Sequence, residues 1–328
     1  MNNINIDSHA HMIPPSFLKM IKEDKLKGIK IIEDDKSRKK SIVFLDGSKH
    51  PFSEVFTSIE KRLELMNSYQ CDKQVVSITP RFFFYDFPLD LAIHTNESFN
   101  NDIAALSKEY PDRFIGMGSV PLQDTNSAIT ELERMNRNLG LKAIQIGTFV
   151  NGYNLSDERF IDFFRKAEEL NIFVFIHPLI KNDDLLVKNY HLSNLVGNPT
   201  QTTIAISNLI FSGLFDIVPN IKIGLAHGGG FLPYQLGRLE HGYEVRQDTK
   251  SKAKKSPREY IKKNIYFDAL THSKEALEFL VKLTGSEKVM FGTDYPYDMA
   301  EYDQIDNINQ LWVHGFNNSG SSNRDLSR

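Results

Sequence analysis

Residues 172–178 read IFVFIHP, a short apolar run rich in β-branched and aromatic residues that ends in a histidine and a proline. Such a run is typical of a buried β-strand. Seven other runs of this kind recur along the chain, at 3–9, 74–80, 114–120, 142–148, 221–227, 264–270 and 288–294. Between them lie segments such as 157–170 and 273–285, whose apolar residues repeat with the period of an amphipathic helix. The alternation predicts an α/β protein with eight strands.

Eight alternations of strand and helix are what a (β/α)8 TIM barrel requires. A doubly wound open sheet is the alternative, but it usually has fewer strands and often a glycine-rich first βα turn, which this chain lacks. Residues 28–50 break the alternation, because two β-prone runs flank a charged turn there, and they predict a β-hairpin inserted after the first strand. We expect one barrel domain over residues 1–310, with the insertion at about 28–50, and a polar, disordered tail at 311–328.

The composition disfavours several classes of protein. The net charge of −3 does not suggest a nucleic-acid-binding surface, and we interpret the basic cluster at 250–264 as a solvated loop and helix face. Cys71 is the single cysteine, so an intrachain disulfide is impossible and a thiolate metal site is disfavoured. The chain has no apolar run approaching the roughly 20 residues that cross a bilayer, and its first residues do not resemble a secretion signal. We therefore expect a cytoplasmic protein without nucleic-acid or membrane partners.

Polar side chains stand where several predicted strands end, which is where a barrel carries its chemistry. His9 and His11 point to the same face of one strand, because successive side chains of a strand alternate. A single histidine can be an ordinary hydrogen-bonded residue, and Asp294 can be a helix cap. Their joint placement favours a metal site formed by His9, His11, His177 and Asp294. Imidazole and carboxylate ligands without thiolate suit Zn²⁺, with Mn²⁺, Co²⁺ and Fe²⁺ as alternatives.

His227 ends another predicted strand and is followed by three glycines. Small residues there would let a substrate approach the backbone closely, although the glycines could equally form a turn. A neutral histidine beside a metal can accept a proton from metal-bound water. We therefore assign His227 to proton transfer rather than to metal binding.

Four motifs of this chain are similar to those of the amidohydrolase superfamily. They are DSHAH at 7–11, FIHP at 175–178, AHGGGFLPYQLGRL at 226–239 and FGTDYPY at 291–297. The sequence most resembles the branch that contains 2-amino-3-carboxymuconate-6-semialdehyde, γ-resorcylate and 5-carboxyvanillate decarboxylases, over residues 3 to about 300. The resemblance implies that His9, His11, His177 and Asp294 bind a divalent metal, usually zinc, and that His227 activates metal-bound water or moves a proton. It also implies a homodimer in which Arg238 reaches the neighbouring active site and binds the substrate carboxylate.

Two features depart from this branch. His50 occupies the position of a carboxylate-binding arginine, which puts the particular substrate in doubt. The residues after 310 also lack the closing helix that such proteins normally have. Arg81, which begins the aromatic stretch RFFFYDF at 81–87, is a further candidate for binding substrate, although Phe82 to Phe84 could equally belong to the core.

We therefore expect a metal-dependent barrel enzyme that removes CO₂ from a small unsaturated or aromatic carboxylate. In this interpretation the metal and Arg238 orient the substrate, and His227 with Asp294 transfers a proton to the carbon that loses CO₂. Two alternatives stay open. The same site could hydrolyse a lactone or ester or add water, or the barrel could be a catalytically silent binding protein.

Overall fold

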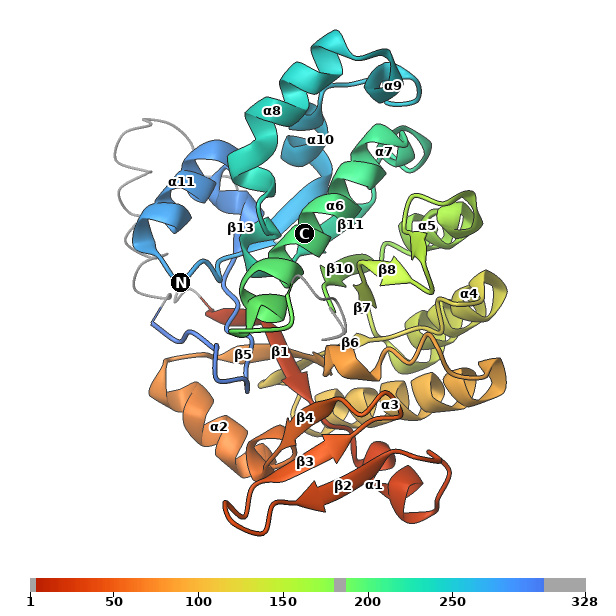
Figure 1. The fold of residues 1–328 in the computed structure, drawn as a ribbon, viewed down its shortest axis with the longest axis vertical. Helices are drawn as coiled ribbons and strands as arrows, with labels where there is room; N and C mark the ends of the chain where they lie inside the picture. Colours follow the sequence, from red (N-terminus) through yellow and green to blue (C-terminus); the bar gives the residue numbers. More distant parts are fainter. Residues whose placement is uncertain (1–3, 180–186, 304–328) are drawn as a thin grey trace.

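Eight parallel strands form a nearly closed TIM barrel in the computed structural model, which describes residues 4–179 and 187–303 (Figure 1). Each of them overlaps a run that the sequence predicts, although β1 extends three residues beyond its predicted run, so the predicted fold class is confirmed. Along the barrel the strands are β1 (Ile6–Met12), β5 (Lys73–Ile78), β6 (Phe114–Gly118), β7 (Ala143–Gly147), β10 (Phe173–His177), β11 (Lys222–Leu225), β12 (Ile265–Asp268) and β13 (Val289–Met290).

The barrel closes where the chain after β13 returns to β1. The Ser8 amide donates to the Phe291 carbonyl, and the Asp294 amide donates to the His9 carbonyl, each over 2.8 Å. An added Cβ at Gly292 would lie 2.8 Å from the Cβ of His9, so only glycine allows this approach. The closure therefore carries Asp294 directly to the histidines of β1.

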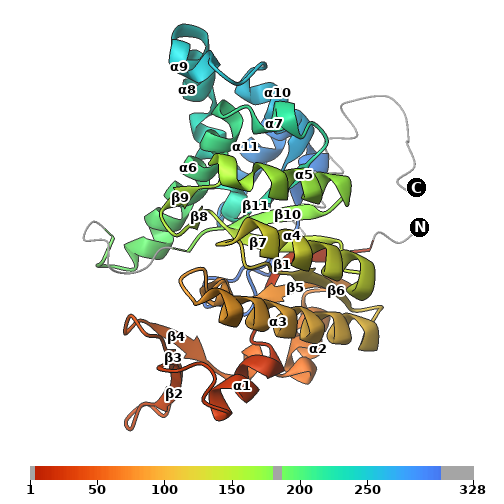
Figure 2. The ribbon, with the colours of Figure 1, turned by 90° about the vertical axis from the view of Figure 1, so that its right-hand side faces the viewer.

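Helices cover the outside of the barrel (Figures 1 and 2). In α3, the buried residues Phe99, Ile103 and Leu106 recur at helical spacing on the side that packs against β6. The helices are α1 (Pro15–Lys22), α2 (Ile59–Ser68), α3 (Leu89–Glu109), α4 (Thr125–Arg134), α5 (Ile161–Glu169), α6 (Asn198–Phe211), α7 (Leu214–Ile217), α8 (Leu232–Val245), α9 (Gln247–Lys250), α10 (Pro257–Asn264) and α11 (Lys274–Thr284). Their apolar faces complete the core around the sheet.

The predicted hairpin insertion is present, but it forms a three-stranded antiparallel sheet. Its strands are β2 (Lys30–Glu33), β3 (Lys40–Val43) and β4 (Lys49–Phe52), in the order β2-β3-β4. The prediction missed β4 because that strand is short and contains Pro51, which lacks an amide hydrogen. Proline is tolerated here because β4 is an edge strand. In Figure 2 this sheet lies at the end of the molecule opposite α8 and α9.

A smaller two-stranded sheet follows β7 and consists of β8 (Phe149–Val150) and β9 (Tyr153–Asn154). Among residues 4–179 and 187–303, no helix is both long and apolar enough to cross a membrane. The predicted tail at 311–328 lies outside the described residues, as does the end of the predicted 1–310 domain.

Candidate metal centre and active site

The four side chains predicted as metal ligands meet at the carboxyl end of the barrel strands. His9 Nε2 and His11 Nε2 are 3.0 Å apart, and Asp294 Oδ1 lies 3.3 Å from the first and 3.0 Å from the second. The His177 ring is centred 5.0 Å from the His9 ring and 5.1 Å from the His11 ring. One donor atom from each of His9, His177, His227 and Asp294 lies within 4.8 Å of the others. We call His9, His11, His177 and Asp294 the metal cluster.

Hydrogen bonds outside the cluster fix which ring nitrogen of each histidine carries a proton. Nδ1 of His9 lies 2.7 Å from Asp268 Oδ2, that of His11 lies 3.0 Å from the Ile78 carbonyl, and that of His177 lies 2.7 Å from the Pro178 carbonyl. Since carbonyl and carboxylate oxygens only accept, we assign the hydrogen to Nδ1 in each ring. Each Nε2 atom then presents a lone pair to the cluster.

This arrangement fits a divalent metal ion. Three imidazole lone pairs and a carboxylate converge, and all four groups are buried. His177 Nε2 and Asp294 Oδ1 have no hydrogen-bond partner among the described residues. Acceptors this close repel one another unless a cation lies between them, and buried polar atoms without partners are rare. Histidines oriented by hydrogen bonds to their second ring nitrogen are typical of metal sites.

The charge states of three of the four cluster residues suit metal binding at neutral pH. Burial, reinforced by the other histidines, holds the pKa of His177 well below its usual value, and burial also lowers the pKa of His11. The pKa of Asp294 lies well below its usual value although burial opposes this, because His9, His11 and His227 favour the carboxylate. His9 differs, since Asp294 and Asp268 raise its pKa against the effect of burial. His11 and His177 are thus neutral and Asp294 is ionised, as metal ligation requires.

Asp268, the last residue of β12, is a residue whose role the sequence analysis missed. Besides contacting His9, its carboxylate accepts hydrogen bonds from the backbone amides of His227 over 2.9 Å and Gly228 over 2.6 Å. It therefore fixes the His9 ring and the turn that carries His227. Its position at the end of a predicted strand could have indicated this role.

Arg62 in α2 was also missed as part of the site. Only 1% of this arginine is exposed, and its guanidinium donates to the His11 carbonyl and to Gln74 Oε1, each over 2.7 Å. The guanidinium also lies 4.4 Å from the centre of the Tyr295 ring. Arg62 thereby connects the two segments that carry His11 and Asp294, through the His11 backbone and the Tyr295 side chain. Nothing in the sequence distinguishes this arginine from one on the surface of an amphipathic helix.

His227 lies beside the metal cluster, but its side chain has fewer hydrogen-bond partners than those of the cluster histidines. Its Nε2 is 3.6 Å from Asp294 Oδ2, and its Nδ1 has no partner among the described residues. Its side chain is 15% exposed and lines a cavity of about 610 Å³ over the cluster. His227 and Asp294 both have left-handed backbone conformations, with φ of 57° and 60°, which are uncommon for residues other than glycine. A side chain in this position can exchange protons with a ligand in the cavity.

The same cavity, which we call the metal cavity, contains two of the three predicted substrate-binding residues. His50 lies in its wall, and His50 Nε2 is 3.0 Å from both Thr79 Oγ1 and Tyr297 Oη. Burial lowers the pKa of His50 to about 4, so this histidine is neutral at pH 7. Arg81 also lines the cavity and forms an ion pair with Asp46. Tyr297 is a further wall residue, and the sequence analysis did not single it out.

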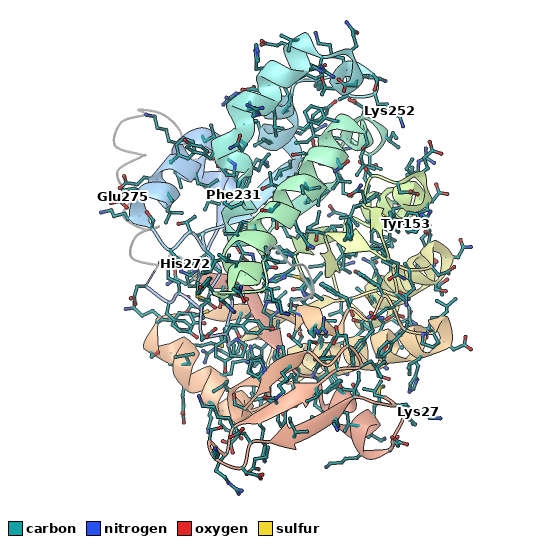
Figure 3. The ribbon with its side chains drawn as sticks, viewed as in Figure 1. Lys27, Tyr153, Phe231, Lys252, His272 and Glu275 are labelled. Atoms are coloured by element: carbon teal, nitrogen blue, oxygen red, sulfur yellow. The ribbon has the colours of Figure 1, made fainter. Side chains whose placement is uncertain are left out.

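Arg238 is placed differently, because it lies exposed on α8 and does not line the metal cavity of its own chain. Tyr234, one helical turn earlier on the same face, is 82% exposed. Phe231, which lies just before α8 and is labelled in Figure 3, is also exposed. The three side chains therefore form an exposed strip on the outside of the barrel.

A family model described as amidohydrolase matches residues 6–312. The chain belongs to this family. It is 39% identical over 303 residues to 2-amino-3-carboxymuconate-6-semialdehyde decarboxylase of Dictyostelium discoideum, covering 91% of this chain and 83% of that protein. It is 28% identical over 257 residues to γ-resorcylate decarboxylase of Rhodococcus jostii, covering 72% of this chain and 77% of the relative. The branch that the motifs predict is thereby confirmed.

The crystal structure of one relative contains bound ligands. The 5-carboxyvanillate decarboxylase of Novosphingobium aromaticivorans was crystallised with manganese and 4-hydroxy-3-methoxy-5-nitrobenzoic acid. The two structures superpose with a TM-score of 0.77 at 26% identity, over 94% of this chain and 89% of the relative. The relative thus holds a divalent metal and an aromatic carboxylate on the same barrel.

Proposed function

We propose that this chain is a metal-dependent, non-oxidative decarboxylase of a small aromatic or unsaturated carboxylate. The observation that carries the proposal is the buried convergence of three imidazole lone pairs and the Asp294 carboxylate beneath a cavity. Membership of a branch whose named relatives are decarboxylases supports the reaction type. His9, His11, His177 and Asp294 would hold the ion. Zn²⁺ suits three imidazoles and one carboxylate, and Mn²⁺ is its main competitor.

Residues of the chain itself carry out proton transfer and hold the reacting groups in place. A divalent ion, when bound, polarises substrate oxygens and offsets the negative charge that develops as the carbon–carbon bond breaks. His227 delivers a proton to the carbon that loses CO₂, so that the electron pair of the broken bond becomes a carbon–hydrogen bond. Its partial exposure and the position of its Nε2 near Asp294 suit this exchange. Asp268 keeps the backbone of His227 in place.

His50 and Arg81 contribute to substrate binding from the metal cavity wall in different ways. Neutral His50, with Thr79 and Tyr297, forms a polar group that can hydrogen-bond a hydroxyl or carbonyl of the substrate. Arg81 supplies positive charge, and a guanidinium has five N–H donors, so its contact with Asp46 leaves donors for a carboxylate.

We further propose a homodimer in which Arg238 binds the substrate carboxylate of the neighbouring subunit. Arg238 is exposed and does not line the cavity of its own chain, and the exposed Tyr234 and Phe231 beside it provide an apolar contact area. Aromatic residues and arginine are enriched in protein interfaces. We also propose that the protein is cytoplasmic.

The test is CO₂ release by purified chain loaded with Zn²⁺ or Mn²⁺, offered γ-resorcylate, 5-carboxyvanillate and 2-amino-3-carboxymuconate-6-semialdehyde. We expect stoichiometric CO₂ and protonated product from at least one of them. Because His227 supplies the proton, the His227→Asn variant should retain metal and lose about 10²–10⁴-fold in kcat. His94→Asn, at an exposed position of α3 and away from the proposed dimer contact, is the matched control and should keep full activity.

Three outcomes would contradict the proposal. Acid formation from a lactone or ester without CO₂ would identify a hydrolase. Metal binding without turnover of any carboxylate would identify a silent barrel. Full activity of His227→Asn would remove His227 from the reaction.

A further inference from the structure

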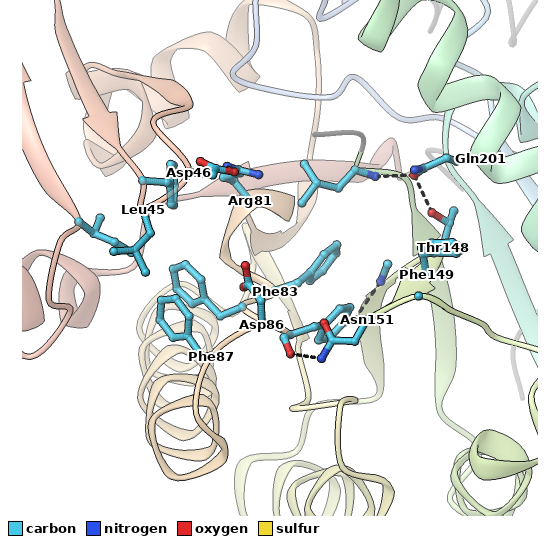
Figure 4. Close-up of a pocket in the computed structure, with 17 residues that line it drawn as sticks. Leu45, Asp46, Arg81, Phe83, Asp86, Phe87, Thr148, Phe149, Asn151 and Gln201 are labelled. Atoms are coloured by element: carbon cyan, nitrogen blue, oxygen red, sulfur yellow. Dashed lines mark hydrogen bonds and ion pairs between the residues drawn. The ribbon is translucent and has the colours of Figure 1, made fainter. Parts of the chain in front are cut away.

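A second cavity, of about 410 Å³, adjoins the metal cavity (Figure 4). Arg81 and Leu179 line both cavities, so the two spaces meet at these side chains. The walls of the second cavity come from the loop after β5, from the segment after β7 and from the tip of the insertion. We call this space the aromatic cavity.

Much of the wall of the aromatic cavity consists of stacked aromatic rings, beside the charged residues Asp46, Arg81 and Asp86. Phe83 and Tyr85 stack with their ring centres 5.4 Å apart and their planes within 5°, and Phe84 and Phe87 stack over 4.1 Å. Phe83 and Phe84 are buried. Stacked aromatic walls bind planar apolar groups, which gain both buried area and ring–ring contacts.

Most polar groups along this cavity already bond to one another. Gln201 Oε1 accepts from Thr148 Oγ1 over 2.9 Å and from the Leu179 amide over 3.3 Å. Asn151 Nδ2 donates to the Tyr85 carbonyl over 2.5 Å, as the dashed lines in Figure 4 show. These groups therefore leave few free hydrogen-bond donors or acceptors for a ligand. Apart from Asp46, Arg81 and Asp86, the surface that remains for binding is chiefly aromatic and aliphatic.

Two exposed apolar side chains flank the cavity from opposite sides. Leu45, at the tip of the insertion, is 69% exposed, and Phe149, at the start of β8, is 46% exposed. Figure 4 shows the insertion on one side of the cavity and the Phe149 segment on the other. A ligand portion seated between them would cover both.

We propose that the aromatic cavity is a substrate subsite that binds a planar apolar group attached to the carboxylate-bearing ring. This inference rests on the proposed function, because it takes the metal cavity as the place where the carboxylate binds. The carboxylate-bearing ring occupies the metal cavity, and its substituent passes Arg81 and Leu179. The substrate class is accordingly an aromatic carboxylate that is larger than a single ring.

The experiment measures binding by calorimetry to the metal-loaded chain, with benzoate, 3-phenylbenzoate and 4-phenylbenzoate as probes. Burying a second ring predicts that at least one phenylbenzoate binds about tenfold or more tightly than benzoate. Leu45→Ala and Phe149→Ala should each weaken the tighter phenylbenzoate about threefold and leave benzoate unchanged. Because both side chains are exposed, the variants should keep the melting temperature of the unmodified chain.

Phe279→Ala is the matched control, since Phe279 is 45% exposed and lines a different cavity next to His227. The proposal is wrong if neither phenylbenzoate binds more tightly than benzoate, or if none of the three acids binds. It is also wrong if Phe279→Ala, and not Phe149→Ala, selectively weakens the phenylbenzoates. Because the assay needs no turnover, tight phenylbenzoate binding without CO₂ release from any carboxylate would overturn the proposed function alone.

Discussion

The metal cavity and the aromatic cavity adjoin, but they are built in different ways. At the metal cluster beneath the metal cavity, His9, His11 and His177 come from barrel strands, and each is held by a hydrogen bond at its second ring nitrogen. In the aromatic cavity, the walls come from loops and from the inserted sheet, and Leu45 and Phe149 are exposed. The barrel therefore positions the chemistry, while loops that tolerate variation shape what else can bind.

A large effect on metal affinity should come from loosening one anchored ligand. Asp268→Asn keeps the size of the side chain but replaces a carboxylate that accepts from His9, His227 and Gly228. We expect metal affinity to fall about 10- to 100-fold, because hydrogen-bond partners of metal-binding histidines typically contribute that much. Competition with a chromogenic chelator measures this change.

Asp102→Asn is the matched control for that variant, since Asp102 accepts a hydrogen bond from the Ser16 amide away from the cluster. It should bind metal as the unmodified chain does. Unchanged affinity in Asp268→Asn would show that the rigid anchoring described for the metal cavity is not needed.

A smaller effect concerns His50, a wall residue whose folded-state pKa is about 4 because of burial. Below pH 6.5 the unfolded chain takes up a proton at this histidine while the folded chain does not. The free energy of unfolding therefore falls as the pH falls, and the loss continues down to about pH 4. Between pH 7 and 5 this group should account for about 2 kcal/mol.

Urea unfolding of the chain and of His50→Asn at several pH values measures this contribution. Both proteins keep the metal cluster, so the difference between their pH slopes isolates His50. The variant should lose about 2 kcal/mol less than the unmodified chain over this range. Equal slopes would mean that His50 is solvated rather than part of a dry wall.

The sequence predicted the barrel and the convergence of the cluster for the same reason. Once eight strands are recognised, the residues that end them must meet at one edge, so His9, His177 and Asp294 could be placed without any long-range contact being known. Arg62 could not be placed in this way, because its partner is the His11 carbonyl and a backbone contact leaves no sequence signal. The strand β4 was missed because Pro51 reads as a loop residue.

The aromatic cavity shows the other limit of prediction. The run of aromatic residues after β5 is evident in the sequence. The sequence does not show, however, which of these residues belong to the core and which line a pocket. Phe82 is fully buried, whereas Phe83 and Phe84 line the aromatic cavity. Leu45 and Phe149 are about a hundred residues apart, and only the fold brings their segments to one cavity.

The most direct test of the account is the metal content of the purified chain after dialysis against Zn²⁺ or Mn²⁺, measured by mass spectrometry. We predict about one ion per chain, and almost none in His177→Ala, because one of four ligands is lost. His191→Ala, a histidine of the same cavity outside the cluster, should keep its metal. A chain that binds no ion, or a His177→Ala variant that binds as much as the unmodified chain, would contradict the metal centre on which the proposed reaction depends.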